Sequence, residues 1–230
     1  MSLKSLNSLA AGTCITIATT LGFSSFLSAI AAPDIRVYSE VPDLETRLNT
    51  TSNNLNRLPQ SHLDVVDPIF IVDRLPGGRR TGGGYYSPAE VRSAWLGKEH
   101  RTGVSDEDIH DYVLSQPDTG LIAITKAAFE NRIYQFTVFH EIAHSVDHHL
   151  GIVPAGSSVS DFAGVRYQHP RVGEYAAETY ARFMLVPNRI CRDGSIPANE
   201  TQSICSQRLT NVLMNSPAFW NVPISFRNQG

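Results

Sequence analysis

The residues best suited to chemistry lie in one stretch, FHEIAHSVDHHLG, which ends at Gly151. His140 and His144 are four residues apart, so on an α-helix their imidazoles lie one turn apart on nearly the same face. Two imidazoles in that arrangement can converge on one zinc ion. Glu141, beside them, is the residue that acts in an H-E-x-x-H site as general base toward the metal-bound water.

The other residues of this stretch are poor candidates for completing the site. His148 would lie about 12 Å along the helix axis from His140, and His149 points to another side, so we expect both to be exposed. The metzincin pattern would place glycine and histidine where Asp147 and Leu150 stand. The third ligand must therefore come from elsewhere in the chain.

A glutamate on a later helix is the remaining source of a third ligand. The segment GEYAAETYARF carries Glu174 and Glu178, four residues apart on one helical face. One of them can bind the ion, and the other can accept a hydrogen bond from a ligand imidazole. The alternative interpretation is a solvated acidic face beside two incidental surface histidines, but the neighbouring alanines and aromatic residues indicate burial.

These side chains need two helices and a sheet to position them. Apolar residues at three- and four-residue intervals predict a helix over 130–150, stopped by Gly151, and a second helix over 174–184. The β-branched runs at 68–74 and 121–125 predict strands. We expect a further helix to open at Ser87 and Pro88, and another within 209–220.

A glycine-rich stretch, PGGRRTGGGYYSP, is expected to be a loop. Its residues 77–84 could form a mobile flap over a substrate. A plain surface loop is the simpler interpretation.

The N-terminal segment has the features of a signal peptide. Lys4 is its only charge, an apolar run follows, and the small residues around Ala31 predict cleavage after residue 31, with an uncleaved membrane anchor as the alternative. The mature chain, 32–230, is expected to be a single domain, secreted and not bound to membrane. It would keep 18 of the 19 basic side chains against 22 acidic ones, which gives no indication of nucleic-acid binding. Cys191 and Cys205 are expected to form a disulfide, with free thiols as the alternative.

The two motifs together resemble those of the anthrax lethal factor protease domain and the related secreted Pro-Pro endopeptidases. HEIAHSVDHHLG is similar to the zinc helix of that family, and GEYAAETYARFM is similar to its glutamate helix. The resemblance covers residues 139–184 and implies that Glu174 is the zinc ligand. It also implies that Tyr167, seven residues earlier, stabilises the oxyanion of the transition state.

The sequence thus predicts an α+β, zincin-like fold with a small sheet packed on the zinc helix and a mainly helical C-terminal part. It predicts a monomeric zinc endopeptidase that acts on a protein or peptide, with the resemblance implying narrow or proline-directed specificity. Other interpretations remain open: a zinc hydrolase of another substrate class, an enzyme that acts on a single protein, or a zinc-bearing, non-catalytic binding module or toxin-like domain that acts on one protein partner.

Overall fold

The computed structural model describes residues 33–165 and 169–223, so the predicted signal peptide and Tyr167 lie outside the described residues. The strands are β1 (Ile35–Val37), β2 (Ile69–Val72), β3 (Gly83–Tyr86) and β4 (Leu121–Thr125). The α-helices are α1 (Leu44–Leu55), α2 (Gln60–Leu63), α3 (Pro88–Trp95), α4 (Glu99–Thr102), α5 (Asp106–Ser115), α6 (Lys126–Glu130), α7 (Tyr134–Leu150), α8 (Val172–Leu185) and α9 (Gln202–Met214). Three 3-10 turns are η1 (Val159–Phe162), η2 (Pro187–Arg189) and η3 (Pro217–Phe219). Within these ranges, no helix has the length and apolarity that a bilayer crossing requires.

The four strands form one mixed sheet in the order β1-β2-β4-β3. β1, β2 and β4 are parallel, and β3 runs antiparallel to β4. Every residue of β2 and β4 is buried. Strands covered on both faces have continuous apolar sequences, which is why these two were predictable.

β3 corrects one prediction, because it occupies the second half of the stretch expected to be a loop. Its residues pair with β4 from Gly83 opposite Ile124 to Tyr86 opposite Leu121. Glycines have low strand propensity, and only the pairing with β4, about forty residues away, makes this segment a strand. The structure therefore turns part of the expected loop into the edge of the sheet.

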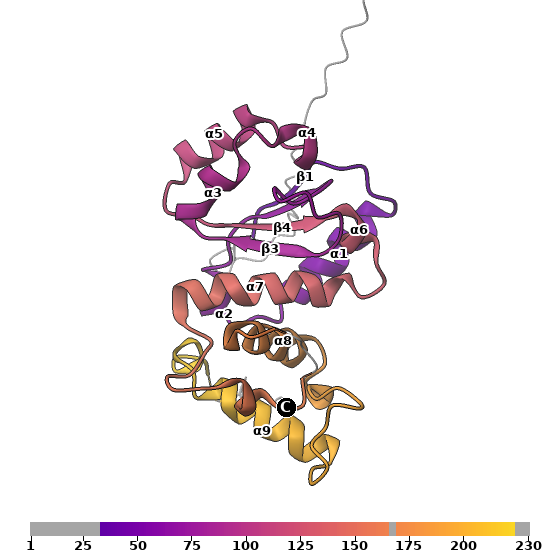
Figure 1. Cartoon of the computed structure of the whole chain (residues 1–230), viewed down its shortest axis with the longest axis vertical. Helices are drawn as coiled ribbons and strands as arrows, with labels where there is room; N and C mark the ends of the chain where they lie inside the picture. Colours follow the sequence, from indigo (N-terminus) through magenta and orange to yellow (C-terminus); the bar gives the residue numbers. More distant parts are fainter. Residues whose placement is uncertain (1–32, 166–168, 224–230) are drawn as a thin grey trace, which may run out of the picture. The chain divides into compact units, whose positions relative to one another are not determined.

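Helices cover both faces of the sheet (Figure 1). Helices α3 and α5 lie over one face, where Phe70 of β2 packs against Trp95 and Tyr112. Helix α7 lies along the other face and contacts β3 and β4. Ser87 precedes α3 as predicted, and its N–H and hydroxyl donate to the Glu90 carboxylate.

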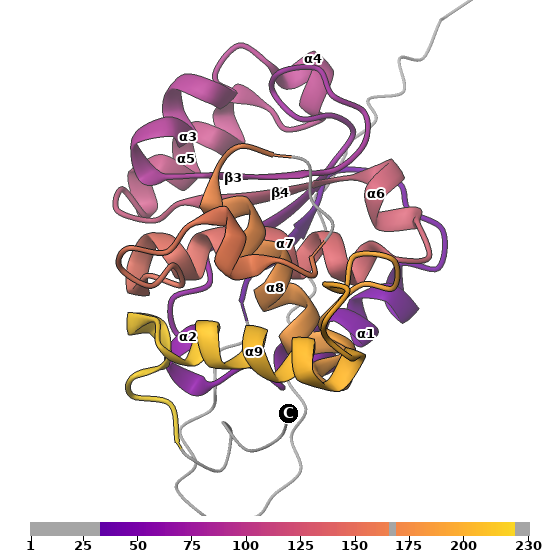
Figure 2. The same ribbon diagram turned by 60° about the horizontal axis from the view of Figure 1, so that its bottom comes forward.

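Helix α7 lies between the sheet and a second helical layer. Figure 2 shows α8 between α7 and α9, in agreement with the contacts among these helices. The predicted stop is confirmed: Gly151 follows the last residue of α7, and its N–H donates to the Asp147 carbonyl. The Asp147 carboxylate then accepts hydrogen bonds from the N–H groups of Ile152 and Val153. Asp147 therefore turns the chain away from the end of the helix.

The C-terminal part is helical, as predicted, and α9 is joined to the chain before it by the predicted disulfide. Cys191 and Cys205 are bonded and buried. Gly164, at φ +109°, packs against the sulfur of each cysteine where a Cβ could not fit. Helix α9 begins earlier than expected, because the hydroxyl of Thr201 accepts from the N–H of Ile204 and caps it.

A buried histidine links the short helix α2 to the C-terminal layer. His62 accepts from the Tyr180 hydroxyl at Nδ1 (2.9 Å) and donates from Nε2 to the Ala218 carbonyl (2.8 Å). Burial lowers the pKa of His62 from 6.5 to about 4. The folded protein therefore favours the neutral imidazole, whereas the unfolded chain takes up a proton below pH 6.5.

This linkage predicts that acid weakens the fold through His62. Its contribution is complete above pH 6.5 and is lost as the pH falls to about 4, by roughly 3 kcal/mol. The unfolding free energies of the native protein and of His62→Gln are measured with urea at several pH values. As the pH falls from 6.5 to about 4, we expect the native protein to lose roughly 3 kcal/mol more stability than the variant does. A difference that does not vary with pH would contradict this role.

Candidate metal centre

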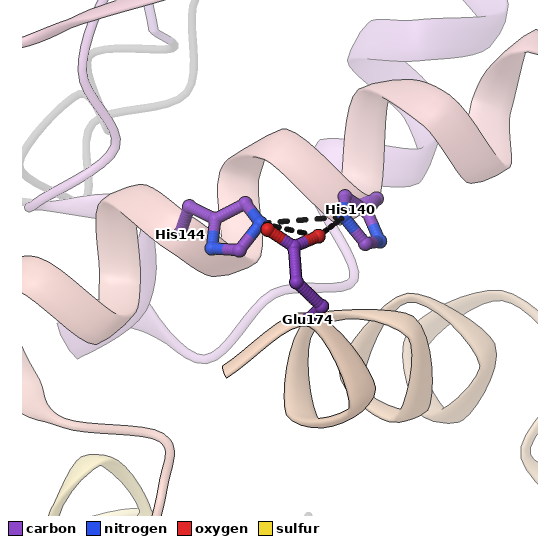
Figure 3. A group of neighbouring side chains, drawn as sticks. All are labelled: His140, His144 and Glu174. Carbon is purple, nitrogen blue, oxygen red and sulfur yellow. Dashed lines mark hydrogen bonds and ion pairs between the residues drawn. The ribbon is translucent and has the colours of Figure 1, made fainter. Parts of the chain in front are cut away.

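Three side chains predicted to bind zinc converge between α7 and α8. His140 and His144 project from successive turns of α7 toward Glu174 in the first turn of α8 (Figure 3). Nε2 of His140 lies 3.2 Å from Oε2 of Glu174 and 3.3 Å from Nε2 of His144. Nε2 of His144 lies 3.6 Å from the same Glu174 oxygen. The three side chains form a group that could hold a metal ion, and this group is called the metal group below.

The spacing of these atoms fits zinc. Ligands at about 2.0–2.1 Å from a tetrahedral ion are separated from one another by roughly 3.4 Å. The three observed distances of 3.2, 3.3 and 3.6 Å bracket that value. Two imidazole nitrogens and one carboxylate oxygen are also the donor types that zinc prefers. The side chains of His144 and Glu174 keep 21% and 20% of their surface exposed, so the group is accessible from solvent.

The charges around the group reinforce one another. A hydrogen bond from His140 and the nearby imidazole of His144 hold the pKa of Glu174 well below its usual range. Burial by itself would lower the pKa of His140, but the carboxylates of Glu174 and Glu178 outweigh burial and raise it to about 9. Glu141 differs, because its burial raises the pKa of its carboxyl above the usual value.

Glu141 lies on the side of α7 that faces the sheet. A Cβ added to Gly83 of β3 would lie 2.5 Å from Cγ and 2.8 Å from Oε1 of Glu141. The carboxylate therefore occupies space that any residue larger than glycine at position 83 would take. The run of glycines in the sequence indicates that something approaches this backbone closely, but the sequence does not show that Glu141 is the residue that does so.

The strand that contacts Glu141, β3, is an edge strand of the sheet. The N–H of Thr125 donates to the carbonyl of Gly82 at 3.0 Å, which sets the alternation of the ladder. In an antiparallel pair every second residue points its backbone groups away from the partner strand, and here these are Gly83 and Tyr85. Nη2 of Arg79 donates to the outward carbonyl of Gly83 at 3.0 Å. In the described part of the chain, β3 ends the sheet on this side.

Glu178 reaches the other ring nitrogen of His140. Its Oε2 lies 3.8 Å from Nδ1 of His140, beyond hydrogen-bond range, and its Oε1 accepts from Nε of Arg182 at 2.7 Å. Burial would raise the pKa of Glu178, but His140 and Arg182 together lower it. Glu174 and Glu178 of α8 therefore lie on opposite sides of the His140 imidazole, Glu174 at Nε2 and Glu178 toward Nδ1.

The two histidines at the end of α7 lie outside this group. Both are exposed, as expected, but neither is isolated. The ring of His148 lies 5.8 Å from that of Tyr85, and Nε2 of His149 lies 3.2 Å from the buried carboxylate of Asp67. Asp67 also accepts from the hydroxyl of Ser145 and thereby fixes α7 to the chain before β2.

Three residues near the group had no place in the sequence-based prediction. Gly83 and Arg79 lie in the segment expected to be a loop, and Arg182 lies one turn beyond Glu178. Tyr167, predicted from the resemblance, lies outside the described residues.

Comparisons with protein-family models, with curated proteins and with solved structures found no match.

The geometry predicts a single zinc site that depends on Glu174 and not on Glu141. We expect the purified protein to bind one Zn²⁺, measured by competition with a chromogenic chelator. Glu174→Gln should weaken binding by more than about 100-fold, because a ligand charge is lost. The control is Glu141→Gln, which changes the neighbouring carboxylate. This variant should bind Zn²⁺ nearly as tightly as the parent does. A parent that binds no Zn²⁺ would show instead a hydrogen-bonded His–Glu–His cluster.

Proposed function

We propose that this protein is a zinc-dependent endopeptidase with a zincin-like active site. One observation carries the proposal: the buried carboxylate of Glu141 interacts with His140, His144 and Glu174 and packs against Gly83 of the edge strand β3. Metal binding alone does not need that carboxylate. A reaction that moves a proton next to the metal does.

Zinc bound by His140, His144 and Glu174 would polarise the substrate carbonyl and lower the pKa of a water molecule. Glu141 takes the proton from the attacking water at its carboxylate and then delivers it to the nitrogen of the leaving amine. Its raised pKa suits both steps, because burial makes the carboxylate a stronger base than an exposed glutamate. Stabilisation of the oxyanion by Tyr167 is proposed from the family resemblance alone.

The edge strand β3 next to Glu141 favours an extended peptide as the substrate. The backbone groups of Gly83 and Tyr85 point outward from β3, so a substrate strand can add to the sheet by main-chain hydrogen bonds. Such a strand would compete with Arg79 for the carbonyl of Gly83. The scissile bond would then pass near Glu141, which contacts Gly83 on the face of β3 toward α7.

Secretion agrees with the rest of the proposal. The disulfide between Cys191 and Cys205 is of the kind that persists in oxidising compartments. The predicted signal peptide would deliver the chain there. We therefore propose that the substrate is an extracytoplasmic protein or peptide.

The decisive experiment is cleavage of a mixed peptide library that includes proline-rich members. Products are read by mass after incubation with the purified protein or with Glu141→Ala. We expect bonds that the parent cuts and the variant spares, because only the proton transfer is removed. Cleavage by neither protein, with Zn²⁺ bound by both, would favour the binding-module alternative.

Gly83→Ala is predicted to impair turnover without removing the metal. The added methyl group pushes the Glu141 carboxylate aside, and a displacement of about 1 Å costs on the order of 100-fold in rate. Gly77→Ala in the same stretch is the matched control, because a Cβ there meets nothing within 4 Å. Turnover and Zn²⁺ content are measured for both variants. Equal turnover of Gly83→Ala and Gly77→Ala would refute the contact.

A further inference from the structure

The interface between α7 and α8 carries a ladder of side chains that extends beyond the metal group. Residues four apart on each helix face one another across this interface. The α7 row is Phe136, His140 and His144, and the α8 row, read in the opposite direction, is Arg182, Glu178 and Glu174. The last rung is Arg182, whose guanidinium lies 5.4 Å from the centre of the Phe136 ring. The ladder thus joins the metal group to a cation two turns away from Glu174.

Glu178 is the link between Arg182 and the metal group. Its two oxygens are divided, with Oε1 at 2.7 Å from Nε of Arg182 and Oε2 facing Nδ1 of His140. Both side chains are largely buried, at 14% and 16% exposed, so water screens their attraction only weakly. Arg182 therefore binds one oxygen of the Glu178 carboxylate while the other oxygen faces His140.

We propose that Arg182 is a positioning residue for the metal centre, acting through Glu178 on His140. By holding Glu178 on the Nδ1 side, it favours the imidazole tautomer with its proton on Nδ1 and its lone pair on Nε2. It also keeps the second carboxylate of α8 away from Glu174. The inference rests on the metal centre of the proposed function.

An arginine suits this position better than a lysine. The planar guanidinium can lie over the Phe136 ring and donate from Nε in the same conformation, and it carries its charge at every relevant pH. A lysine ammonium has no plane to stack and would approach Glu178 as a point charge. Arg182→Lys should therefore restore only part of what Arg182→Met removes.

The test measures Zn²⁺ affinity by chelator competition, independently of any activity. We expect Arg182→Met to weaken Zn²⁺ binding by about 10–100-fold, the range found for outer residues that orient a ligand. Glu178→Gln should have a similar effect. Because both act on the same imidazole, adding Arg182→Met to Glu178→Gln should change affinity by no more than about twofold.

Arg47→Met is the matched control for a general effect on α7. Arg47 also stacks on an aromatic residue of that helix, at 5.1 Å from the ring centre of Tyr134, but donates to the carbonyls of Phe129 and Glu130. It should lower thermal stability while leaving Zn²⁺ affinity unchanged. Circular dichroism establishes that each variant folds. If Arg182→Met does not fold, Arg182→Lys and Glu178→Gln are compared in its place.

The absorption spectrum of the Co²⁺-substituted protein provides a second measurement. We expect it to change in Arg182→Met and to stay as in the parent in Arg47→Met, because only the former alters a ligand's orientation. Equal Zn²⁺ affinities for Arg182→Met and the parent, or additive losses in the double variant, would overturn the role of Arg182 alone. Absence of Zn²⁺ binding by the parent would overturn the metal centre as well.

Discussion

The burial of α7 on two opposite sides is the constraint on which the rest of the structure depends. One side packs on β3 and β4, and the other packs on α8. A helix with apolar neighbours all round must bury polar side chains wherever its sequence contains them, and those side chains need partners. His140 and His144 contact Glu174 on α8, while the Ser145 hydroxyl donates to Asp67, which precedes β2.

The same burial separates the two functions that the H-E-x-x-H cluster would perform. The histidines face α8, where carboxylates favour cations, whereas Glu141 faces the sheet, where burial raises its pKa. Adjacent residues of a helix point about 100° apart, so one turn of α7 can direct side chains both toward the sheet and toward α8. The candidate metal group is assembled from two helices, and the proposed base is held by a helix and a strand.

Close approach of the backbone is the second requirement of this arrangement. β3 lies near enough to α7 for Gly83 to contact the Glu141 side chain, and a larger residue would separate them. At its two glycines the strand gives up the side-chain packing that normally stabilises an edge, and its pairing with β4 compensates. The edge that carries the outward backbone groups of Gly83 and Tyr85 is thereby brought beside the carboxylate.

The sequence by itself determined the features that depend on local pattern. The long helix that stops before Gly151, the buried strands β2 and β4, and the pairing of Cys191 with Cys205 all follow from periodicity, apolar runs or composition. The convergence of His140 and His144 follows from a spacing of four residues on a helix. Each of these needs only neighbours in the chain, or the redox compartment, to be inferred.

Only the tertiary structure decided the features that depend on contacts between distant segments. The glycine-rich stretch reads as a loop until β4 pairs with it, so neither β3 nor the contact of Gly83 with Glu141 could be inferred locally. Glu174 and Glu178 were equivalent by spacing, and the packing of α8 on α7 placed one at Nε2 and the other toward Nδ1 of His140. Free-energy differences between such arrangements arise from long-range packing and desolvation, which the order of residue types along a chain does not encode locally.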